Sequence, residues 1–166
     1  YPTRALIDFS GTEFNELSKS VADGSITKPR FYLRLFEAEG NSDLTLTYKL
    51  AAIPLSQSWD EGVGKFGDNP KTTNGCSWKN RNFFPGASET NWTTAGGTVY
   101  NVSASDQSFS NQSPDVEMDV TSMVSGWISG SLENYGMLLR FSGSQETDDE
   151  TFGQLKFFST QTHTVF

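Results

Sequence analysis

Cysteine and histidine are nearly absent from this chain of 166 residues. Cys76 is the only cysteine, which excludes an internal disulfide, and His163 is the only histidine. A conventional Cys–His nucleophilic pair would require these two residues to meet in space. We expect instead that Cys76, in the segment "NGCSW", is a small buried residue.

Clusters of positive charge and long apolar runs are missing as well. The 12 lysines and arginines are scattered singly, and the net charge is −8. A basic surface for nucleic acid or for an anionic membrane is therefore not expected. No apolar run approaches the ~20 residues that a transmembrane helix needs, so we expect no membrane-spanning segment.

The motifs of common catalytic sites are also lacking. Asp60 and Glu61, in "SWDEG", are the best carboxylate pair, but adjacent loop residues do not by spacing alone flank a glycosidic bond on both sides. The segment "GVGKFG" (62–67) lacks the strand–loop–helix frame of a phosphate-binding loop. We predict that Asp60 and Glu61 cap a loop and that the chain has no catalytic residues.

Aromatic residues and short alternating segments are abundant. The 13 phenylalanines and four tryptophans predict a core of high aromatic content. Apolar and polar residues alternate in 30–40 and 43–53, as in half-buried strands. Residues 11–29 read as a polar connection with only weak helical spacing. Further strand-like segments lie at 3–10, 98–105, 115–120, 135–143 and 153–160. This pattern predicts an all-β fold, an antiparallel β-sandwich or jelly roll.

One segment, "DVTSMVSGWISGSLENYGMLLR" (119–140), changes to helical spacing. Four apolar side chains form one stripe of a short helix expected at about 121–129: Met123, Val124, Trp127 and Ile128. Thr121 is placed to act as the N-cap, and Gly130 to end the helix in a left-handed conformation. Because so short a helix is not stable alone, we expect it to cap the core by burying Trp127.

The stretch 54–98 is rich in Gly, Asn, Pro, Ser and Thr, which predicts long irregular loops. Loops of this length in a compact domain tend to be functional. Sugar rings stack their apolar faces on aromatic side chains, and four aromatic residues in or beside these loops are candidates for a sugar platform: Trp59, Trp78, Trp92 and Tyr100. The alternative is that these side chains cap the ends of the core.

The densest charge run is "ETDDE" (146–150). Asp148, Asp149 and Glu150 are weak candidates for calcium ligands, because calcium prefers carboxylate and carbonyl oxygens. The run lacks the full spacing of a known calcium loop, and a solvated charged turn is the alternative. We expect no cofactor, and a stabilising role for calcium if it binds.

Several segments, in their order, resemble a DNRLRE-type domain, and the match runs over most of the chain. The segments are "RALIDFSG", "RFYLRLFEAEG", "SWDEGVGKFGD" (58–68), "CSWKNRN" (76–82) and "DVTSMVSGWISGSLENYGMLLR". That family is similar to jelly-roll carbohydrate-binding modules of large extracellular, cell-surface and polysaccharide-degrading proteins. Two departures are the lack of a strand before "RALIDF" and of a proline after Arg81. No ligand residues carry over, because the matched motifs look structural.

The resemblance implies one β-sandwich domain over 1–166, expected to be a segment of a longer chain that lacks its first strand. Within that family the sequence looks closer to the versions of the domain in bacteriophage virion proteins. It therefore implies a non-enzymatic structural or adhesion module of an extracellular assembly, such as a phage fibre, neck, tail or capsid attachment. The expected partners are other copies of the chain, other virion proteins and polysaccharide. The alternative function is a carbohydrate-binding module of a secreted or cell-surface protein.

Overall fold

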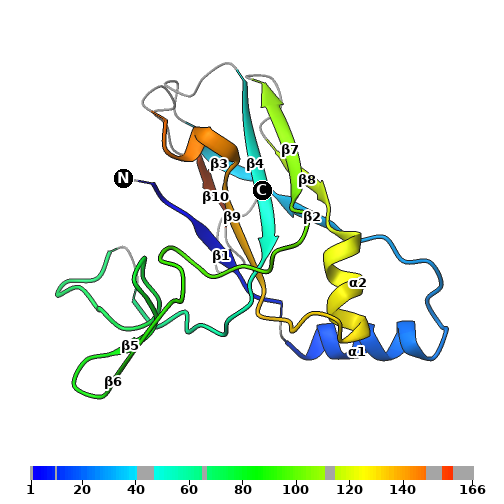
Figure 1. The fold of residues 1–166 in the computed structure, drawn as a ribbon, viewed down its shortest axis with the longest axis horizontal. Coiled ribbons are helices and arrows are strands. Elements are labelled where there is room, and N and C mark those ends of the chain that lie inside the picture. The colour runs from blue at the N-terminus through cyan, green and yellow to red at the C-terminus, as the bar shows by residue number, and fades with distance from the viewer. Residues whose placement is uncertain are drawn as a thin grey trace.

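The larger layer of the fold is a four-stranded antiparallel sheet (Figure 1). The computed structural model describes residues 2–9, 11–40, 47–64, 67–110, 115–148 and 155–158. Across the sheet the strands follow the order β1 (Ala5–Ile7), β9 (Met137–Phe141), β4 (Thr47–Pro54) and β7 (Ser105–Ser110). The central strands β9 and β4 are the most apolar, as expected for strands that are covered on both faces.

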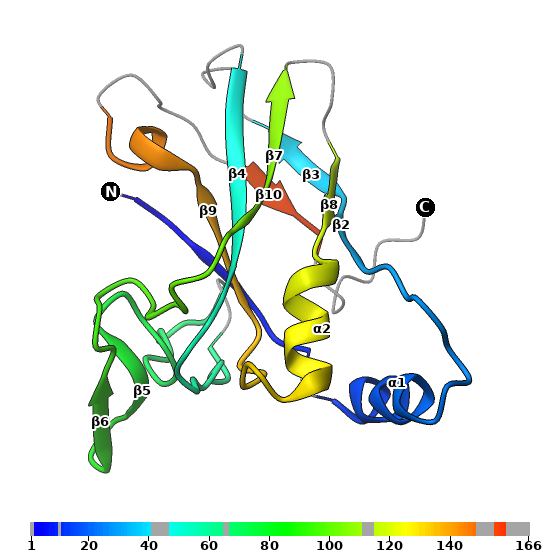
Figure 2. The same cartoon turned by 45° about the vertical axis from the view of Figure 1, so that its right-hand side comes forward.

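The second layer consists of two antiparallel strand pairs, which lie across the core from the larger sheet (Figure 2). In the first pair, β2 (Tyr32–Leu35) lies beside β8 (Val116–Asp119). In the second, β3 (Glu37–Gly40) lies beside β10 (Leu155–Phe157). Phe36 alone separates β2 from β3, so the two pairs follow each other along the chain. The prediction of an antiparallel, sandwich-like all-β fold is confirmed.

The core between the layers follows from strand alternation, because successive side chains point to opposite faces. Leu33 and its cross-strand partner Met118 are buried, whereas their neighbours on the same strands face outward. The Tyr48 ring stacks on Phe109, with ring centroids 5.0 Å apart. The main core cluster also contains Leu50, Ala52, Val116, Met137 and Leu139 from the strands of the two layers.

One long side of the sandwich is closed by the side chain of Gln107. Its Oε1 accepts a hydrogen bond from the Glu117 N–H (2.7 Å), and its Nε2 donates to the Asp115 carbonyl (3.3 Å). Gln107 therefore ties β7 of the larger layer to β8 of the smaller one, and it satisfies backbone groups that an edge strand would otherwise expose.

Helix α2 (Thr121–Ser129) has the predicted bounds and covers one end of the sandwich (Figure 1). Trp127 is 6% exposed and joins the core with Met123 and Val124. Gly130 has φ +73°, the expected left-handed conformation. The N-cap prediction for Thr121 is wrong. Val120 occupies the cap position, and its apolar side chain makes no cap bond; the Thr121 hydroxyl accepts from the Phe31 N–H (2.9 Å).

A second helix, α1 (Thr12–Ala22), lies where we expected a polar connection. Phe14, Leu17 and Val21 follow one another at helical spacing, and each is half-buried. The Phe14 ring meets Trp127 edge-on at 6.2 Å. Tertiary contact with α2 therefore stabilises a segment whose own apolar signal is weak. Neither α-helix in the described ranges is long and apolar enough to span a membrane.

The prediction of a strand at 98–105 is also wrong. Val99 makes only an isolated bridge to Leu55, and the strand of the sheet is β7. Within 54–98 a hairpin of β5 (Asn80–Phe84) and β6 (Ser88–Asn91) interrupts the loops. Gly86, at φ +78°, lies in its turn. A 3-10 helix, η1 (Gly143–Glu146), follows β9.

Candidate functional site

A second, smaller core lies on the outer face of the four-stranded sheet. On β9, Leu138 points away from the main core because its neighbours Met137 and Leu139 point into it. Leu138 packs with Leu55 and Trp92, and all three are buried. Further side chains pack partly against this cluster: Leu6, Trp59, Cys76, Val99 and Tyr135. The irregular loops after β4 thus cover an apolar sheet face.

Two of the four candidate platform aromatics take part in this packing. Trp92 is only 6% exposed, and its Nε1 donates to the Ser77 carbonyl at 3.0 Å. Trp59 is half-buried, and its Nε1 donates to the Tyr135 carbonyl at 2.9 Å. Each indole N–H therefore has a partner inside the protein, as expected for a buried tryptophan.

Tyr100 is held in a comparable way. Its hydroxyl oxygen accepts from the Glu133 N–H at 3.0 Å, and its own backbone N–H donates to the Pro54 carbonyl at 3.0 Å. The side chain is half-buried and links the loop before β7 to the turn that follows α2. Its hydroxyl oxygen thus supports the fold.

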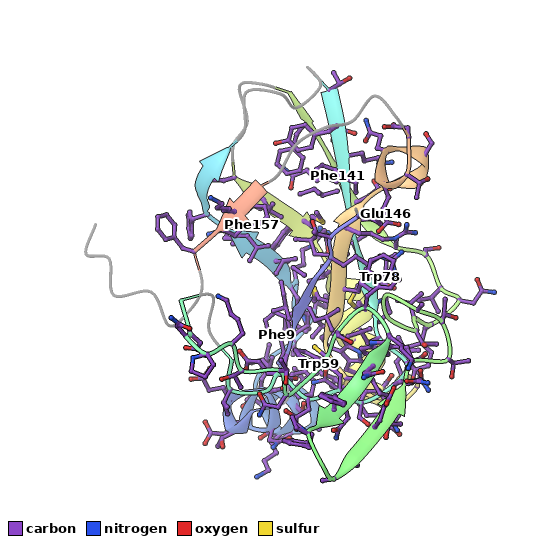
Figure 3. All side chains as sticks on the ribbon, turned by 90° about the vertical axis from the view of Figure 1, so that its left-hand side faces the viewer. Phe9, Trp59, Trp78, Phe141, Glu146 and Phe157 are labelled. Atoms are coloured by element: carbon purple, nitrogen blue, oxygen red, sulfur yellow. The ribbon has the colours of Figure 1, made fainter. Side chains whose placement is uncertain are left out.

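Trp78, whose side chain is labelled in Figure 3, differs from the other three because the residue is 44% exposed. The Arg4 guanidinium lies over the indole, 4.7 Å from the ring centroid. Gly96 donates its N–H to the Trp78 carbonyl at 2.6 Å. A Cβ on Gly96 would lie 2.9 Å from a ring carbon, and its φ of +83° also favours glycine. Arg4 and Gly96 therefore hold the ring, and part of its surface remains open to solvent.

Arg4 belongs to a charged cluster centred on Glu146. The Glu146 carboxylate accepts from Arg4 Nε (2.6 Å) and Nη2 (2.9 Å). It also accepts from Arg140 Nη1 at 2.6 Å. Arg4 Nη1 donates to the Gly96 carbonyl at 2.8 Å. The Glu146 side chain is only 6% exposed, and its bonds join η1 to β9 and to the residue before β1, while Arg4 continues the link to the Trp78 loop.

The surroundings of Glu146 favour its charged form. Burial would raise the pKa of this carboxyl, but hydrogen bonds and charges from Arg4 and Arg140 outweigh burial and lower the pKa below its ordinary value. Arg4 and Arg140 flank the register pair Ala5–Leu139, so they face each other across β1 and β9. The Glu146 carboxylate offsets the repulsion that two cations in this position would produce.

Asp60 and Cys76, the residues considered for catalysis, lie in surroundings that serve the loop structure. Asp60 Oδ1 accepts from the Gly62 N–H at 2.8 Å, which confirms Asp60 as a loop cap. Cys76 is half-buried. Burial raises the pKa of its thiol, and the charges of Asp60 and Glu61 raise it further. A raised pKa lowers the thiolate fraction on which nucleophilic and metal-binding chemistry depends.

The calcium hypothesis is only partly accessible to the structure. Asp149, Glu150 and His163 lie outside the described residues. Asp148 follows η1, and its N–H donates to the Ser144 carbonyl at 2.7 Å. Within the described ranges, no group of three or more His, Cys, Asp or Glu residues is placed to hold a metal ion. Calcium binding in this run therefore stays a prediction.

Sequence reasoning did not find the Arg4–Glu146–Arg140 cluster. Arg4 and Glu146 are 142 positions apart, and each looks like an ordinary solvated charge. The one available signal was Arg140, a charge inside the apolar strand "MLLRF".

Comparisons with protein-family models, curated proteins and solved structures gave no match to this chain.

Proposed function

We propose that this chain is a non-enzymatic structural or adhesion module of an extracellular assembly, with the bacteriophage virion as the assembly that its motifs resemble. The observation that carries the proposal is that the loop aromatics are bonded to the protein itself. Trp59, Trp92 and Tyr100 each have a polar atom bonded inside the protein, and Trp92 is buried. Loops with such packing build a firm surface for contact with neighbouring subunits.

The charged and nucleophilic groups of the loops support the same proposal. Asp60 is engaged by the Gly62 N–H, and the surroundings of Cys76 favour its neutral thiol. Neither arrangement supplies the activated nucleophile or the paired acid and base that hydrolytic chemistry requires. The partners that we propose are further copies of the chain and other proteins of the assembly.

The virion assignment is tested on particles from the source of the sequence. Particles are purified on a density gradient, treated with nuclease and washed with salt, and their peptides are identified by mass spectrometry. We expect peptides of this chain to sediment with intact particles at a constant ratio to other particle proteins. Peptides found only in the unsedimented fraction would contradict a virion role.

A carbohydrate-binding module with a jelly-roll fold is the second candidate function. Its specific support is Trp78, the one platform candidate with a widely exposed ring. Aromatic faces stack on the apolar faces of sugar rings, and Arg4 and Gly96 hold this indole in a fixed position. Of the four candidate aromatics, Trp78 is therefore the residue on which the sugar-binding hypothesis rests.

Affinity electrophoresis in gels that contain different polysaccharides tests this second function. If the module binds glycan, Trp78→Ala should abolish the retardation, whereas Phe84→Ala is the matched control because Phe84 is an exposed aromatic on the β5–β6 hairpin (36%). Retardation that both variants keep would exclude Trp78 as the platform. A parent protein that no polysaccharide retards would leave only the structural role.

A further inference from the structure

The outer face of the β2–β8 pair carries side chains of two different kinds. On β2, Tyr32 is 46% and Arg34 64% exposed. On β8, Glu117 is 57% and Asp119 48% exposed. Arg34 lies opposite Glu117 in the strand register, and Tyr32 lies opposite Asp119. Because these residues alternate with buried ones, all four project from the same face.

The two strands of this face form columns of opposite charge. The β2 column consists of Arg30, Tyr32, Arg34 and Phe36, and the β8 column of Asp115, Glu117 and Asp119. Arg34 Nε lies 3.0 Å from Glu117 Oε2, and Arg30 Nη1 lies 3.9 Å from Asp119 Oδ2. Phe36 is 58% exposed. The face thus places cations and aromatic rings on one side and carboxylates on the other.

We propose that a second copy of this chain binds the β2–β8 face, related to the first by a two-fold axis parallel to the strands. Such an axis keeps the height along the strands and exchanges the two columns. Arg34 of the second copy then lies over Glu117 of the first, and Tyr32 of the second copy over Asp119. The two ion pairs combine into a group of four alternating charges, and the same contacts occur twice, as in any isologous interface.

The charges select this axis over the alternative. A two-fold axis across the strands would place each β8 column over the other β8 column, so the carboxylates of Glu117 and Asp119 would face carboxylates. Like charges brought together in an interface are unfavourable. The contact removes the exposed ring surfaces of Tyr32 and Phe36 from water, which adds to the exposed ion pairs, and the Tyr32 hydroxyl faces the Asp119 carboxylate of the other copy. Beside Tyr32, a shallow hollow lined by Pro29, Arg30, Asp119, Thr121 and Ser122 offers room for an aromatic ring.

The contact has consequences for affinity. Two short strands per copy form an area at the small end of specific interfaces, so we expect association only at protein concentrations on the order of 0.1–1 mM. Within an assembly that holds many copies together, the high local concentration would compensate for this weakness. Because the ion pairs are exposed, association should weaken as salt concentration rises.

Sedimentation equilibrium of the 166-residue chain tests the proposal. We expect a monomer–dimer equilibrium that Arg34→Glu weakens at least tenfold and that Glu117→Arg weakens similarly. The double variant Arg34→Glu/Glu117→Arg should restore it, because the exchanged columns remain complementary under the same axis. Lys79→Glu is the matched control. Lys79 is about as exposed as Arg34 (70% against 64%), and the substitution likewise reverses one charge of an exposed ion pair, here with Glu89 (45% exposed, 2.7 Å) on the hairpin.

Three outcomes would overturn the proposal. The first is a strictly monomeric chain up to about 1 mM. The second is an association that Lys79→Glu weakens as much as Arg34→Glu does. The third is a double variant as weak as the single ones. A circular dichroism melt of each variant shows that the fold is kept. Because the test reads association of the purified chain, its failure is distinguishable from absence of the chain in virions.

Discussion

The side chain of Arg4 is joined to the carboxylate of Glu146 by two hydrogen bonds, of 2.6 and 2.9 Å, although the residues are 142 positions apart. Together with Arg140 the pair links the first described strand, β1, to the strand β9 and to η1. Arg4 also lies over Trp78 and is bonded to Gly96. The cluster therefore fixes both an edge of the sheet and the exposed aromatic ring.

Glu146→Ala should destabilise the fold by about 2 kcal/mol, between the values for an exposed and for a fully buried ion pair, because the cluster is partly buried. The substitution removes three hydrogen bonds and leaves Arg4 and Arg140 facing each other. Urea denaturation followed by fluorescence measures the loss. Glu89→Ala is the control, because its partner Lys79 is 70% exposed and such surface pairs contribute at most about 1 kcal/mol. Equal losses in the two variants would contradict a special role for Glu146.

The same carboxylate should make stability depend on acid. The folded-state pKa of Glu146 is lowered, whereas the unfolded chain titrates near the ordinary value of about 4.3. A lowered pKa contributes stability that is present above the unfolded value and is lost as pH falls through the folded value. The difference in unfolding free energy between the parent and Glu146→Gln should therefore be constant above about pH 5 and shrink below about pH 4.

Two exposed carboxylates with lowered pKa values do not disturb this comparison of the parent with Glu146→Gln. Hydrogen bonds from Ser25 lower the pKa of Asp23, and hydrogen bonds from Thr121 lower that of Asp119. Both groups are present in the parent and in Glu146→Gln, so their contributions cancel in the difference. A difference that stays constant down to pH 3 would show that Glu146 does not titrate with a lowered pKa.

The parts of the fold that could be predicted have a strong local signal. Trp127 and Gly130 could be placed because helical spacing and a C-terminal glycine lie within ten residues of each other. By contrast, β7 reads "SDQSFS", and its contribution to the buried core cluster is Phe109. Its position in the sheet depends on pairing with β4, which is distant in sequence. Helix α1 likewise depends on the contact between Phe14 and Trp127.

The candidate site shows the same division. Composition indicated that the loops carry the tryptophans, but it could not separate Trp78 from Trp92. That distinction depends on Leu138, whose outward side requires a cover, and on Arg4, which supports the exposed ring. Both contacts join residues that are far apart in the sequence. A single sequence carries no signal for them.

Trp127→Ala should cost about 3–5 kcal/mol, the usual range for removing a large buried aromatic. The ring is 6% exposed and lies against Phe9 and Phe14. Its Nε1 is buried and has no hydrogen-bond partner among the described residues. Trp127→Phe should therefore cost much less, because it keeps most of the apolar contact and removes an unsatisfied donor. Thermal melts compare the two, and equal losses would show that the indole N–H is satisfied.

Thr121→Val should destabilise the fold by about 1–2 kcal/mol by leaving the Phe31 N–H without its acceptor. Valine keeps the shape of threonine, so packing changes little. The amides that lose protection from hydrogen exchange distinguish two roles for the Thr121 hydroxyl. A link between α2 and β2 predicts faster hydrogen exchange at the Phe31 amide, whereas an N-cap would protect Met123 and Val124. We expect exchange to rise at Phe31 and to stay unchanged at Met123. The opposite pattern would restore Thr121 as the helix cap.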